Sequence, residues 1–304
     1  MASPRVACLI LNTNRRDDTL ACLASLQAST YPNQFTLVLD CQSTDGSVEA
    51  VRAQYPDVRI IPLTDNRGYA GNNNVGIAAA LDQGADWVFV LNEDTVLAPE
   101  AIAHLVAAGE QDPRIGMVGP LVHHHDEPTV IQSAGGRLTP DWDGYHLGQN
   151  EDDRGQYTAP YAVDWISGCA LLVRRDVIQQ LGPFEERFFI YWEETEWCVR
   201  AGQAGWRLMI VPAARIWHKG VQREYRPKPG VTYYSTRNHF LMLALRRAPL
   251  GAKLATWSRT LRTLASWSLR PKWRDKRPHR DAMLAGVVDY LFGRFGRWTP
   301  PAVP

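Results

Sequence analysis

Carboxylates follow a short apolar run in the first third of the chain, where they could bind a metal ion. Four apolar residues, Val88–Leu91, lead directly into Asn92-Glu93-Asp94. Such a run is typical of a strand buried on both faces of a parallel sheet, and open α/β sheets bind their ligands at the carboxyl ends of the strands. Two carboxylates there could hold a hard divalent cation that in turn binds phosphate oxygens. Taken alone, the motif suits a strand followed by a solvated acidic turn equally well.

A second acidic cluster and a histidine cluster lie farther along the chain. Glu193, Glu194 and Glu196 follow an aromatic-rich segment, 184–192. The run His123-His124-His125-Asp126 has metal-binding residue types, but successive residues of a strand point to opposite faces. One ion could not easily use all three histidines, and we therefore favour a solvated loop for them.

The elements that must position these residues follow from the pattern of apolar residues. Short apolar runs predict strands at 6–11, 35–40, 58–62 and 88–91, and helical spacing predicts helices at 17–28, 48–54 and 75–81, with a polar loop at 66–74. Four strands joined by helical crossovers predict a doubly wound parallel sheet. Three strand ends carry polar residues, at Asn12-Thr13-Asn14, Asp40 and Asn92-Glu93-Asp94. This coincidence favours a nucleotide site at that edge of the sheet.

Two common nucleotide-binding motifs are missing from the sequence. No G-x-G-x-x-G follows the first strand, and no G-x-x-x-x-G-K-[ST] loop occurs, which disfavours a dinucleotide-binding domain and a phosphate-loop ATPase. Beyond the fourth strand we expect helices at 99–109, 174–181 and 199–204, irregular β structure at 121–160, and strands at 163–173 and 207–211. Three further helices are expected at 240–247, 250–269 and 281–295.

Charge is unevenly distributed along the chain. The whole chain has a net charge of +1, but residues 237–298 contain 14 Lys and Arg against 3 Asp and Glu, a net of +11, and the remainder contains 19 against 29, a net of −10. This predicts an acidic body and a basic tail with different partners. The five cysteines form no C-x-x-C pair, which favours reduced thiols in the cytosol. We expect neither a signal peptide nor a membrane-spanning run of about 18 apolar residues.

In their order, these motifs resemble glycosyltransferase family 2, the inverting enzymes of the GT-A fold, and most closely its rhamnosyltransferase-like branch. The resemblance runs from Val6 to about Asn238 and is carried by Asp40 with Ser43–Ser47, Asn66–Gly68 with Gly71–Ile77, Leu91–Thr95, Ser167-Gly168 with Arg174-Arg175, Phe184–Tyr191, Glu193–Glu196, Ala204–Trp206 and His218. It implies an α/β GT-A domain, Rossmann-like with a mostly parallel sheet and flanking helices, followed by a basic helical extension. It also implies transfer of rhamnose or another hexose from a dTDP or UDP sugar.

The resemblance further implies roles for single residues. Asp94 and His218 would bind a divalent metal, Mg²⁺ or Mn²⁺, and Glu194 stands at the position of the family's catalytic base. The donor site would comprise Asn12, Thr13, Asn14, Asp40, Asp45, Arg67, Gly68, Asn74, Asn92, Glu93, Ser167 and Gly168. Within that set, residues 12–14 and 40 would surround the base and ribose, and residues 67–74 would close over the nucleotide.

Inverting transfer explains why these residue types are needed. Negative charge grows on the leaving diphosphate, where a divalent cation offsets it, and positive charge grows on the sugar ring. The acceptor hydroxyl must lose a proton, and a carboxylate base typically contributes about 10²–10⁴-fold in rate. On the acceptor side we expect Trp165, Trp192 and Glu193 beside the sugar and Arg237 at an acceptor phosphate, although both tryptophans would serve equally in an ordinary core.

The sequence departs from the family pattern at four positions. Cys41 stands where Asn is usual beside Asp40, and Glu185, Glu194 and Glu196 stand where Asp is common. The longer side chain moves a base by about 1.5 Å, which suits a different acceptor placement or a weakened activity, and Glu194 could instead cap the following helix. Two alternatives therefore stay open: a non-catalytic protein that binds sugar nucleotides or lipid-linked glycans, and a nucleotidyltransferase, which would want a glycine-rich loop after the first strand.

The basic tail predicts a second region of the protein. We divide the chain into a catalytic domain at 1–236, with a nucleotide half to about residue 120 and an acceptor half at 121–236, and a basic amphipathic helical region at 237–304. Basic helices that carry tryptophan suit an anionic membrane surface, where a polyprenyl-linked acceptor would lie. This predicts a cytoplasmic enzyme, peripheral on the inner face of the membrane. A solvated cap or a homodimer contact is the alternative, and nucleic acid is not an expected partner.

Overall fold

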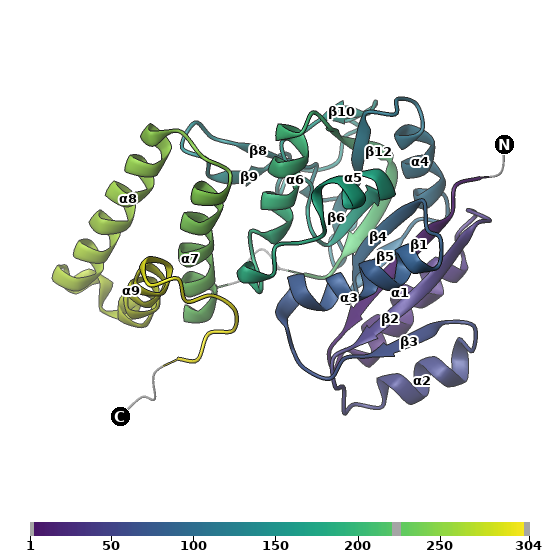
Figure 1. Ribbon diagram of the computed structural model, residues 1–304, viewed down its shortest axis with the longest axis horizontal. Coiled ribbons are helices and arrows are strands. Elements are labelled where there is room, and N and C mark those ends of the chain that lie inside the picture. The colour runs from purple at the N-terminus through teal and green to yellow at the C-terminus, as the bar shows by residue number, and fades with distance from the viewer. Residues whose placement is uncertain (1–2, 221–225, 301–304) are drawn as a thin grey trace.

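The computed structural model describes residues 3–220 and 226–300 and shows an α/β body with a helical region packed against one end (Figure 1). The first part of the body contains β1 (Val6–Asn12), α1 (Arg16–Gln27), β2 (Gln34–Asp40), α2 (Ser47–Gln54), β3 (Arg59–Pro62), α3 (Gly68–Asp82) and β4 (Trp87–Asn92). The four predicted strands and the first two helices are confirmed to within one residue at each end.

Helix α3 begins earlier than the sequence predicts. We expected a polar loop at 66–74, but the helix starts at Gly68. Asparagine side chains supply hydrogen bonds that the helix start needs: Asn72 Oδ1 accepts the N–H of Arg67, and Asn73 Nδ2 donates to the carbonyl of Tyr69 one turn back. These contacts outweigh the low helix propensity of glycine and asparagine.

The second part of the body differs more from expectation. It contains β5 (Thr95–Leu97), α4 (Ala101–Gly109), β6 (Ile115–His124), β7 (Ile131–Ser133), β8 (Gly136–Leu138), β9 (Gly144–His146), β10 (Tyr161–Ala162), β11 (Ala170–Arg174), α5 (Arg175–Leu181), η1 (Glu186–Phe188), α6 (Glu193–Gln203) and β12 (Arg207–His218). The long strand β6 was not predicted at 115–120. Only the last part of the expected strand 163–173 is a strand, and α6 begins at Glu193 instead of residue 199.

Ten of the described strands form one sheet. Its order is β10-β12-β6-β11-β4-β1-β2-β3, with β5 paired to β12 and β7 to β6. Strands β4, β1, β2 and β3 are parallel, as the alternation of strands and helices predicts, and β12 is parallel to β6. Strand β11 is antiparallel to both neighbours, β4 and β6. The sheet is therefore mixed, and the antiparallel β11 joins its two parts.

The central strands are buried on both faces. Val6–Ile10 of β1 and Trp87–Leu91 of β4 have no exposed surface, and helices cover the sheet from two sides (Figure 1). Burial on both faces explains why these strands are unbroken apolar runs. Where the runs end, at Asn12 and Asn92, the polar residues reach one common edge.

The helical region packs closely on the body. It contains α7 (Pro229–Leu245), α8 (Leu250–Leu269), η2 (Pro271–Lys276) and α9 (Arg277–Leu291). The boundary expected between residues 236 and 237 falls inside α7, so the helical region begins at Pro229, where a proline opens the helix. The division into two domains stays a prediction. Among the described residues, no helix is long and apolar enough to cross a membrane.

Candidate active site

The polar strand ends meet at one edge of the sheet. In the register of the parallel strands, Asn12 lies opposite Asp40, and Leu11 lies opposite Asn92. Strand β5 follows Asp94 and pairs with β12, so that Thr95 lies opposite His218. The pairing of β5 with β12 thus brings Asp94 and His218 together although they are far apart in the sequence.

Asp94 and His218 form a close pair. Asp94 Oδ1 lies 3.1 Å from His218 Nε2. The other carboxylate oxygen, Oδ2, accepts the N–H of Gly220 at 3.1 Å. The second ring nitrogen of His218, Nδ1, is hydrogen-bonded to Gln132 Oε1 at 2.7 Å. Burial alone would lower the pKa of His218, but the Cys169 thiol and the Asp94 carboxylate raise it to about 10. Burial alone would raise the pKa of Asp94, but its hydrogen bond with His218 holds it below the ordinary value.

The spacing of this pair fits two ligands of one divalent cation. Adjacent ligands of an octahedral ion with bonds of about 2.1 Å lie about 3 Å apart, and the carboxylate oxygen and imidazole nitrogen are 3.1 Å apart. The described part of the chain holds no group of three or more His, Cys, Asp or Glu suited to a metal. The other ligands would therefore be water and substrate oxygens, as is usual where Mg²⁺ binds substrate phosphates.

Asn12 and Asp40 form a polar cluster at the ends of β1 and β2. Asn12 Nδ2 donates to Asp40 Oδ1 at 2.7 Å and to Ser43 Oγ at 3.0 Å, and the Ser43 N–H donates to Asp40 Oδ2 at 3.1 Å. Thr13 and Asn14, the next two residues of the chain, are exposed. The chain itself orients the Asp40 carboxylate, which suits a group that must present one oxygen to a ligand.

Asp45 and Asn74 hold loops together. Asp45 accepts the N–H groups of Arg16 at 2.9 Å and Ser47 at 3.1 Å, and its contact with a donor stays a prediction. Asn74 Oδ1 accepts the Phe184 N–H, and Asn74 Nδ2 donates to the Phe184 carbonyl, both at 3.0 Å. Asn74 thus ties α3 to this segment, and its contact with the nucleotide stays a prediction.

Arg67 and Gly68 pack against the segment that precedes α6. Arg67 pairs with Glu186 at 2.5 Å. Gly68 has a φ of +76°, and a Cβ there would lie 2.2 Å from the carbonyl oxygen of Phe189, so only glycine allows this approach. The start of α3 and the segment before α6 are therefore held together, and the donor contacts of Arg67 and Gly68 stay predictions.

A cavity of about 540 Å³, here called the central cavity, opens between these strand ends and the start of α6. Seven predicted site residues line it: Asn92, Asp94, Ser167, Gly168, Glu193, Glu194 and His218. It thus brings the metal-ligand pair and the acidic pair into one space. Glu93 is not among its lining residues, and burial raises the pKa of this half-buried carboxyl to about 7.

Glu193 and Glu194 begin helix α6 at the wall of the central cavity. Glu193 is buried, and its Oε2 has no hydrogen-bond partner among the described residues, whereas Glu194 is partly exposed. Burial raises the pKa of both carboxyls, and the neighbouring Glu194 charge raises that of Glu193 further. Trp192 occupies the N-cap position, so Glu194 is not the helix cap. A carboxylate with a raised pKa is a stronger proton acceptor.

The approach segment, residues 189–192, enters α6 along an unusual backbone path. Phe189, Tyr191 and Trp192 have φ values of 66°, 68° and 76°, a conformation that costs about 1–3 kcal/mol for each residue other than glycine. Asn238, fully buried on α7, places its Nδ2 2.8 Å from the carbonyl oxygens of Phe188, Ile190 and Tyr191. Helix α7 therefore holds the segment that aims Glu193 and Glu194.

Arg237, the neighbour of Asn238, serves the same purpose. Its guanidinium is 1% exposed, and its N–H groups donate to the Asn238 side chain, the Tyr233 hydroxyl and the carbonyl oxygens of Arg187, Phe188 and Gly296. All of its donors are used inside the fold, and its contact with an acceptor phosphate stays a prediction.

The two tryptophans expected beside an acceptor sugar do not line the central cavity. Trp165 is 5% exposed, covers Gly136 and meets His146 edge to face at 4.6 Å. It supports the cavity wall from behind, and its contact with the acceptor stays a prediction. Trp192 stacks on His239 at 4.4 Å and lines a separate cavity in the helical region instead of the central cavity.

Several residues of the central cavity were not foreseen. The central cavity is also lined by His124, Gln132, His146, Gln149 and Asn150. We expected solvated histidines at 123–125, but His123 and His124 are buried at the end of β6. The apolar run that precedes them was the available signal. Burial lowers the pKa of His146 to about 4, which keeps its imidazole neutral.

Comparison with known proteins places these features in a family. Residues 8–182 match the family model for glycosyl transferase family 2. The N-acetylglucosaminyl-diphospho-decaprenol L-rhamnosyltransferase of Mycobacterium tuberculosis is 33% identical over 263 residues, which cover 75% of this chain and 82% of that protein. The dTDP-rhamnosyl transferase RfbF of Shigella flexneri is 23% identical over 72% of this chain and 73% of that protein.

Solved structures agree on the fold. The mannosyltransferase PcManGT of Pyrobaculum calidifontis, in complex with GDP-Man and Mn²⁺, is similar with a TM-score of 0.60 at 18% identity and covers 97% of this chain and 89% of its own. S. aureus TarS 1–349 has a TM-score of 0.59 at 16% identity, covering 94% and 80%. At these identities the likeness shows the GT-A fold alone. The family model and the rhamnosyltransferase relative together show that this chain belongs to glycosyltransferase family 2 and is a glycosyltransferase of the hexosyltransferase type.

Proposed function

We propose that this enzyme transfers a hexosyl group, rhamnose or a related sugar, from a nucleoside-diphosphate sugar to a glycan hydroxyl with inversion at the anomeric carbon. One observation carries the proposal: the central cavity holds Asp94 and His218 on one side and Glu193 and Glu194 on another. Inverting transfer needs a group for the leaving diphosphate and a base for the acceptor, and the cavity offers a candidate for each.

On the donor side, Asn12 and Asp40 would hold the nucleoside and Asp94 and His218 the metal. The preoriented Asp40 carboxylate would accept hydrogen bonds from the base or ribose, and Arg15, 3.4 Å from Asp94 Oδ2, adds positive charge at that edge. A bound Mn²⁺ or Mg²⁺ would supply the charge that offsets the leaving diphosphate. Relatives named for dTDP-rhamnose and neighbours solved with UDP or GDP-Man and Mn²⁺ support a donor of this class.

On the acceptor side, Glu194 would accept the proton of the attacking hydroxyl. Glu194 is the partly exposed member of the acidic pair, whereas Glu193 is buried, so Glu193 would keep its proton while Glu194 is ionised. Gly168 lies beside Glu194, since a Cβ there would be in van der Waals contact with the Glu194 side chain at 3.5 Å. Neutral His146 and the amides of Gln132 and Gln149 line the remaining wall, where they could hydrogen-bond an acceptor sugar.

The helical region supports a lipid-linked acceptor at an anionic membrane face. On the outer side of α8, Leu250, Leu254, Leu261 and Leu269 are exposed at helical spacing, and Lys253, Arg262 and Arg270 flank them. Exposed leucines among basic residues suit insertion at the headgroup level of anionic lipids. The relative from M. tuberculosis is named for a decaprenol-linked acceptor. We therefore propose peripheral binding at the cytoplasmic face, with dimerisation through these helices as the competing outcome.

Co-sedimentation with vesicles tests the membrane part. Wild type should bind vesicles that contain an anionic lipid and not neutral ones, Leu254→Glu with Leu261→Glu should lose binding, and the exposed control Ala53→Glu on α2 should keep it. The membrane role is wrong if the double variant binds anionic vesicles as wild type does. It is also wrong if wild type is a dimer and the double variant is a monomer.

Release of nucleoside diphosphate tests the reaction. The protein is incubated with Mn²⁺, a panel of dTDP, UDP and GDP sugars, and short-chain lipid-diphosphate N-acetylglucosamine as acceptor. We expect release with at least one donor, abolished by Asp94→Asn and by removal of the metal. Release that is unaffected by either change would refute the metal role, and no thermal stabilisation by any nucleotide would refute the donor class.

A further inference from the structure

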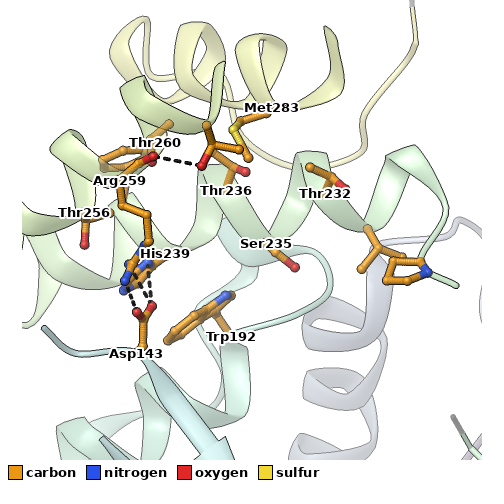
Figure 2. A pocket seen from close by; sticks show the side chains of 14 residues that line it. Asp143, Trp192, Thr232, Ser235, Thr236, His239, Thr256, Arg259, Thr260 and Met283 are labelled. Carbon is orange, nitrogen blue, oxygen red and sulfur yellow. Dashed lines mark hydrogen bonds and ion pairs between the residues drawn. The ribbon is translucent and has the colours of Figure 1, made fainter. Parts of the chain in front are cut away.

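A second cavity lies between helices α7 and α8, beside the turn that joins β8 to β9 (Figure 2). Its volume is about 360 Å³, at the small end of the range for ligand pockets, about 300–1,000 Å³. We call it the helical cavity. Six hydroxyl side chains line it: Thr232, Ser235, Thr236, Thr256, Thr260 and Thr263. Such a density of hydroxyl groups is not needed to pack two helices together.

One of these hydroxyls lacks a partner. Thr256 is 2% exposed, and among the described residues its Oγ1 has no hydrogen-bond partner. By contrast, Thr263 Oγ1 donates to the carbonyl of Arg259 at 2.9 Å. Buried hydroxyls are normally bonded, because an unmade hydrogen bond is costly. This Oγ1 has almost no accessible surface, so a ligand in the helical cavity would become its partner only after the Thr256 side chain turned toward the cavity.

The charged groups of the helical cavity balance one another. Arg259 donates to both carboxylate oxygens of Asp143, and His239 Nδ1 lies 3.7 Å from Asp143 Oδ1; Figure 2 shows both side chains directed at this carboxylate. Burial lowers the pKa of His239, which favours the neutral ring. The Asp143 carboxylate would repel an anion, and the paired guanidinium leaves little net charge to attract one. The cavity therefore suits a neutral, strongly hydrogen-bonding ligand.

The apolar surface of the helical cavity and its position further restrict the class of ligand that it suits. Trp192 and Phe240 also line the helical cavity, and Trp192 is held flat on His239 at 4.4 Å with 9° between the rings. The residues on either side of Trp192, Tyr191 and Glu193, line the central cavity. The two cavities thus lie on opposite sides of the approach segment.

We propose that the helical cavity binds a neutral sugar ring of the acceptor glycan, next to the sugar whose hydroxyl is glycosylated. Sugar hydroxyls donate and accept hydrogen bonds, as do the threonine and serine hydroxyls, and a carboxylate and a guanidinium offer further acceptors and donors. The C–H face of a sugar ring packs on aromatic side chains such as Trp192. The identity of the ligand as part of an acceptor rests on the proposed function, whereas the binding of a sugar does not.

Ligand-observed NMR on the full chain tests the proposal. The probes are the methyl glycosides of N-acetylglucosamine, glucose, galactose and rhamnose, together with inorganic diphosphate. Thr256→Val removes the unpaired hydroxyl with little change in volume, and Ser235→Phe fills the cavity from α7. Thr30→Val is the matched control, because Thr30 lies outside the cavity and its hydroxyl donates to the carbonyl of Pro99 at 3.2 Å. Circular dichroism checks that each variant is folded.

At least one methyl glycoside should bind wild type and Thr30→Val equally, bind Thr256→Val about 3- to 10-fold more weakly, as expected for one lost hydrogen bond, and fail to bind Ser235→Phe. The proposal is overturned if no methyl glycoside binds wild type, if binding is unchanged in Ser235→Phe, or if diphosphate alone binds. Thermal stabilisation by nucleotide and Mn²⁺ is measured on the same samples. If nucleotide and Mn²⁺ do not stabilise wild type, the proposed function is contradicted. If they stabilise wild type but no methyl glycoside binds, only the proposal for the helical cavity is contradicted.

Discussion

Replacing Asn238 by alanine should harm catalysis more than it harms the fold. Asn238 Nδ2 serves the carbonyl oxygens of Ile190 and Tyr191, and its Oδ1 accepts from Arg237 Nε at 2.9 Å. The third carbonyl, that of Phe188, still accepts a hydrogen bond from the Arg237 guanidinium at 2.9 Å. Each buried group left unpaired costs about 1–3 kcal/mol. Two or three such groups predict a loss of about 2–9 kcal/mol, out of a total stability of about 5–15 kcal/mol.

The catalytic cost follows from the strained backbone that Asn238 holds. Without it, Tyr191 and Trp192 can leave the left-handed region, where each has a φ near 70°, and the start of α6 would turn with them. A shift of about 1 Å at a reacting group can cost about 10²-fold in rate. We therefore expect kcat to fall by about that factor, while the affinity for the donor nucleotide, which is proposed to bind at Asn12, Asp40 and Asp94, stays close to wild type.

A variant of matched stability separates the two effects. Leu105 is fully buried in α4, in the core cluster on one face of the sheet, and Leu105→Ala should cost about 2–5 kcal/mol. Melting temperature and kcat are measured for both variants, with kcat taken where both are folded. Leu105→Ala should match the fall in melting temperature and keep its kcat. Equal kcat values in the two variants would refute the idea that α7 aims the acidic pair.

Two further predictions concern the acidic pair itself. Glu194→Gln should lower kcat by about 10²–10⁴-fold with unchanged nucleotide affinity in calorimetry, and a kcat within the range of wild type would remove Glu194 as the base. Burial raises the pKa of Glu193 above the value of about 4.3 that a glutamate has in an unfolded chain. Above about pH 4.3 the folded protein therefore keeps a proton that the unfolded chain has released. The free energy of unfolding consequently falls as the pH rises above about 4.3. Glu193→Gln cannot titrate at this position. The melting temperature of the variant, relative to that of wild type, should therefore rise between pH 5 and pH 8. Parallel curves of melting temperature against pH would contradict the buried, protonated carboxyl.

The nucleotide part of the fold was predictable because its signals are local. β1 and β4 are buried on both faces, so they appear in the sequence as unbroken apolar runs that stop at Asn12 and Asn92. Since parallel strands end at a common edge, the polar residues beyond them could be placed together without knowledge of the whole structure. The resemblance to a family then added His218, which the pairing of β5 with β12 brings to Asp94.

The acceptor side was predicted less well because its contacts are distant in sequence. Nothing near Arg237 or Asn238 shows that their side chains bond carbonyl groups some fifty residues earlier, so Arg237 was assigned to a phosphate. Asn74 was assigned to the nucleotide for the same reason, although Phe184 occupies its amide. His124 was missed because the strand β6 that buries it is interrupted by glycine and proline.

Electron paramagnetic resonance of Mn²⁺ tests the central claim most directly. The signal of free Mn²⁺ is followed while the protein is added, with and without dTDP or UDP, for wild type, Asp94→Asn and His218→Ala. We predict that wild type binds Mn²⁺ weakly alone and much more tightly with a nucleoside diphosphate, since Asp94 and His218 supply only two of the ligands, and that both variants lose this gain. Equal binding of Mn²⁺ with nucleotide in wild type and in both variants would contradict the assignment of the metal site.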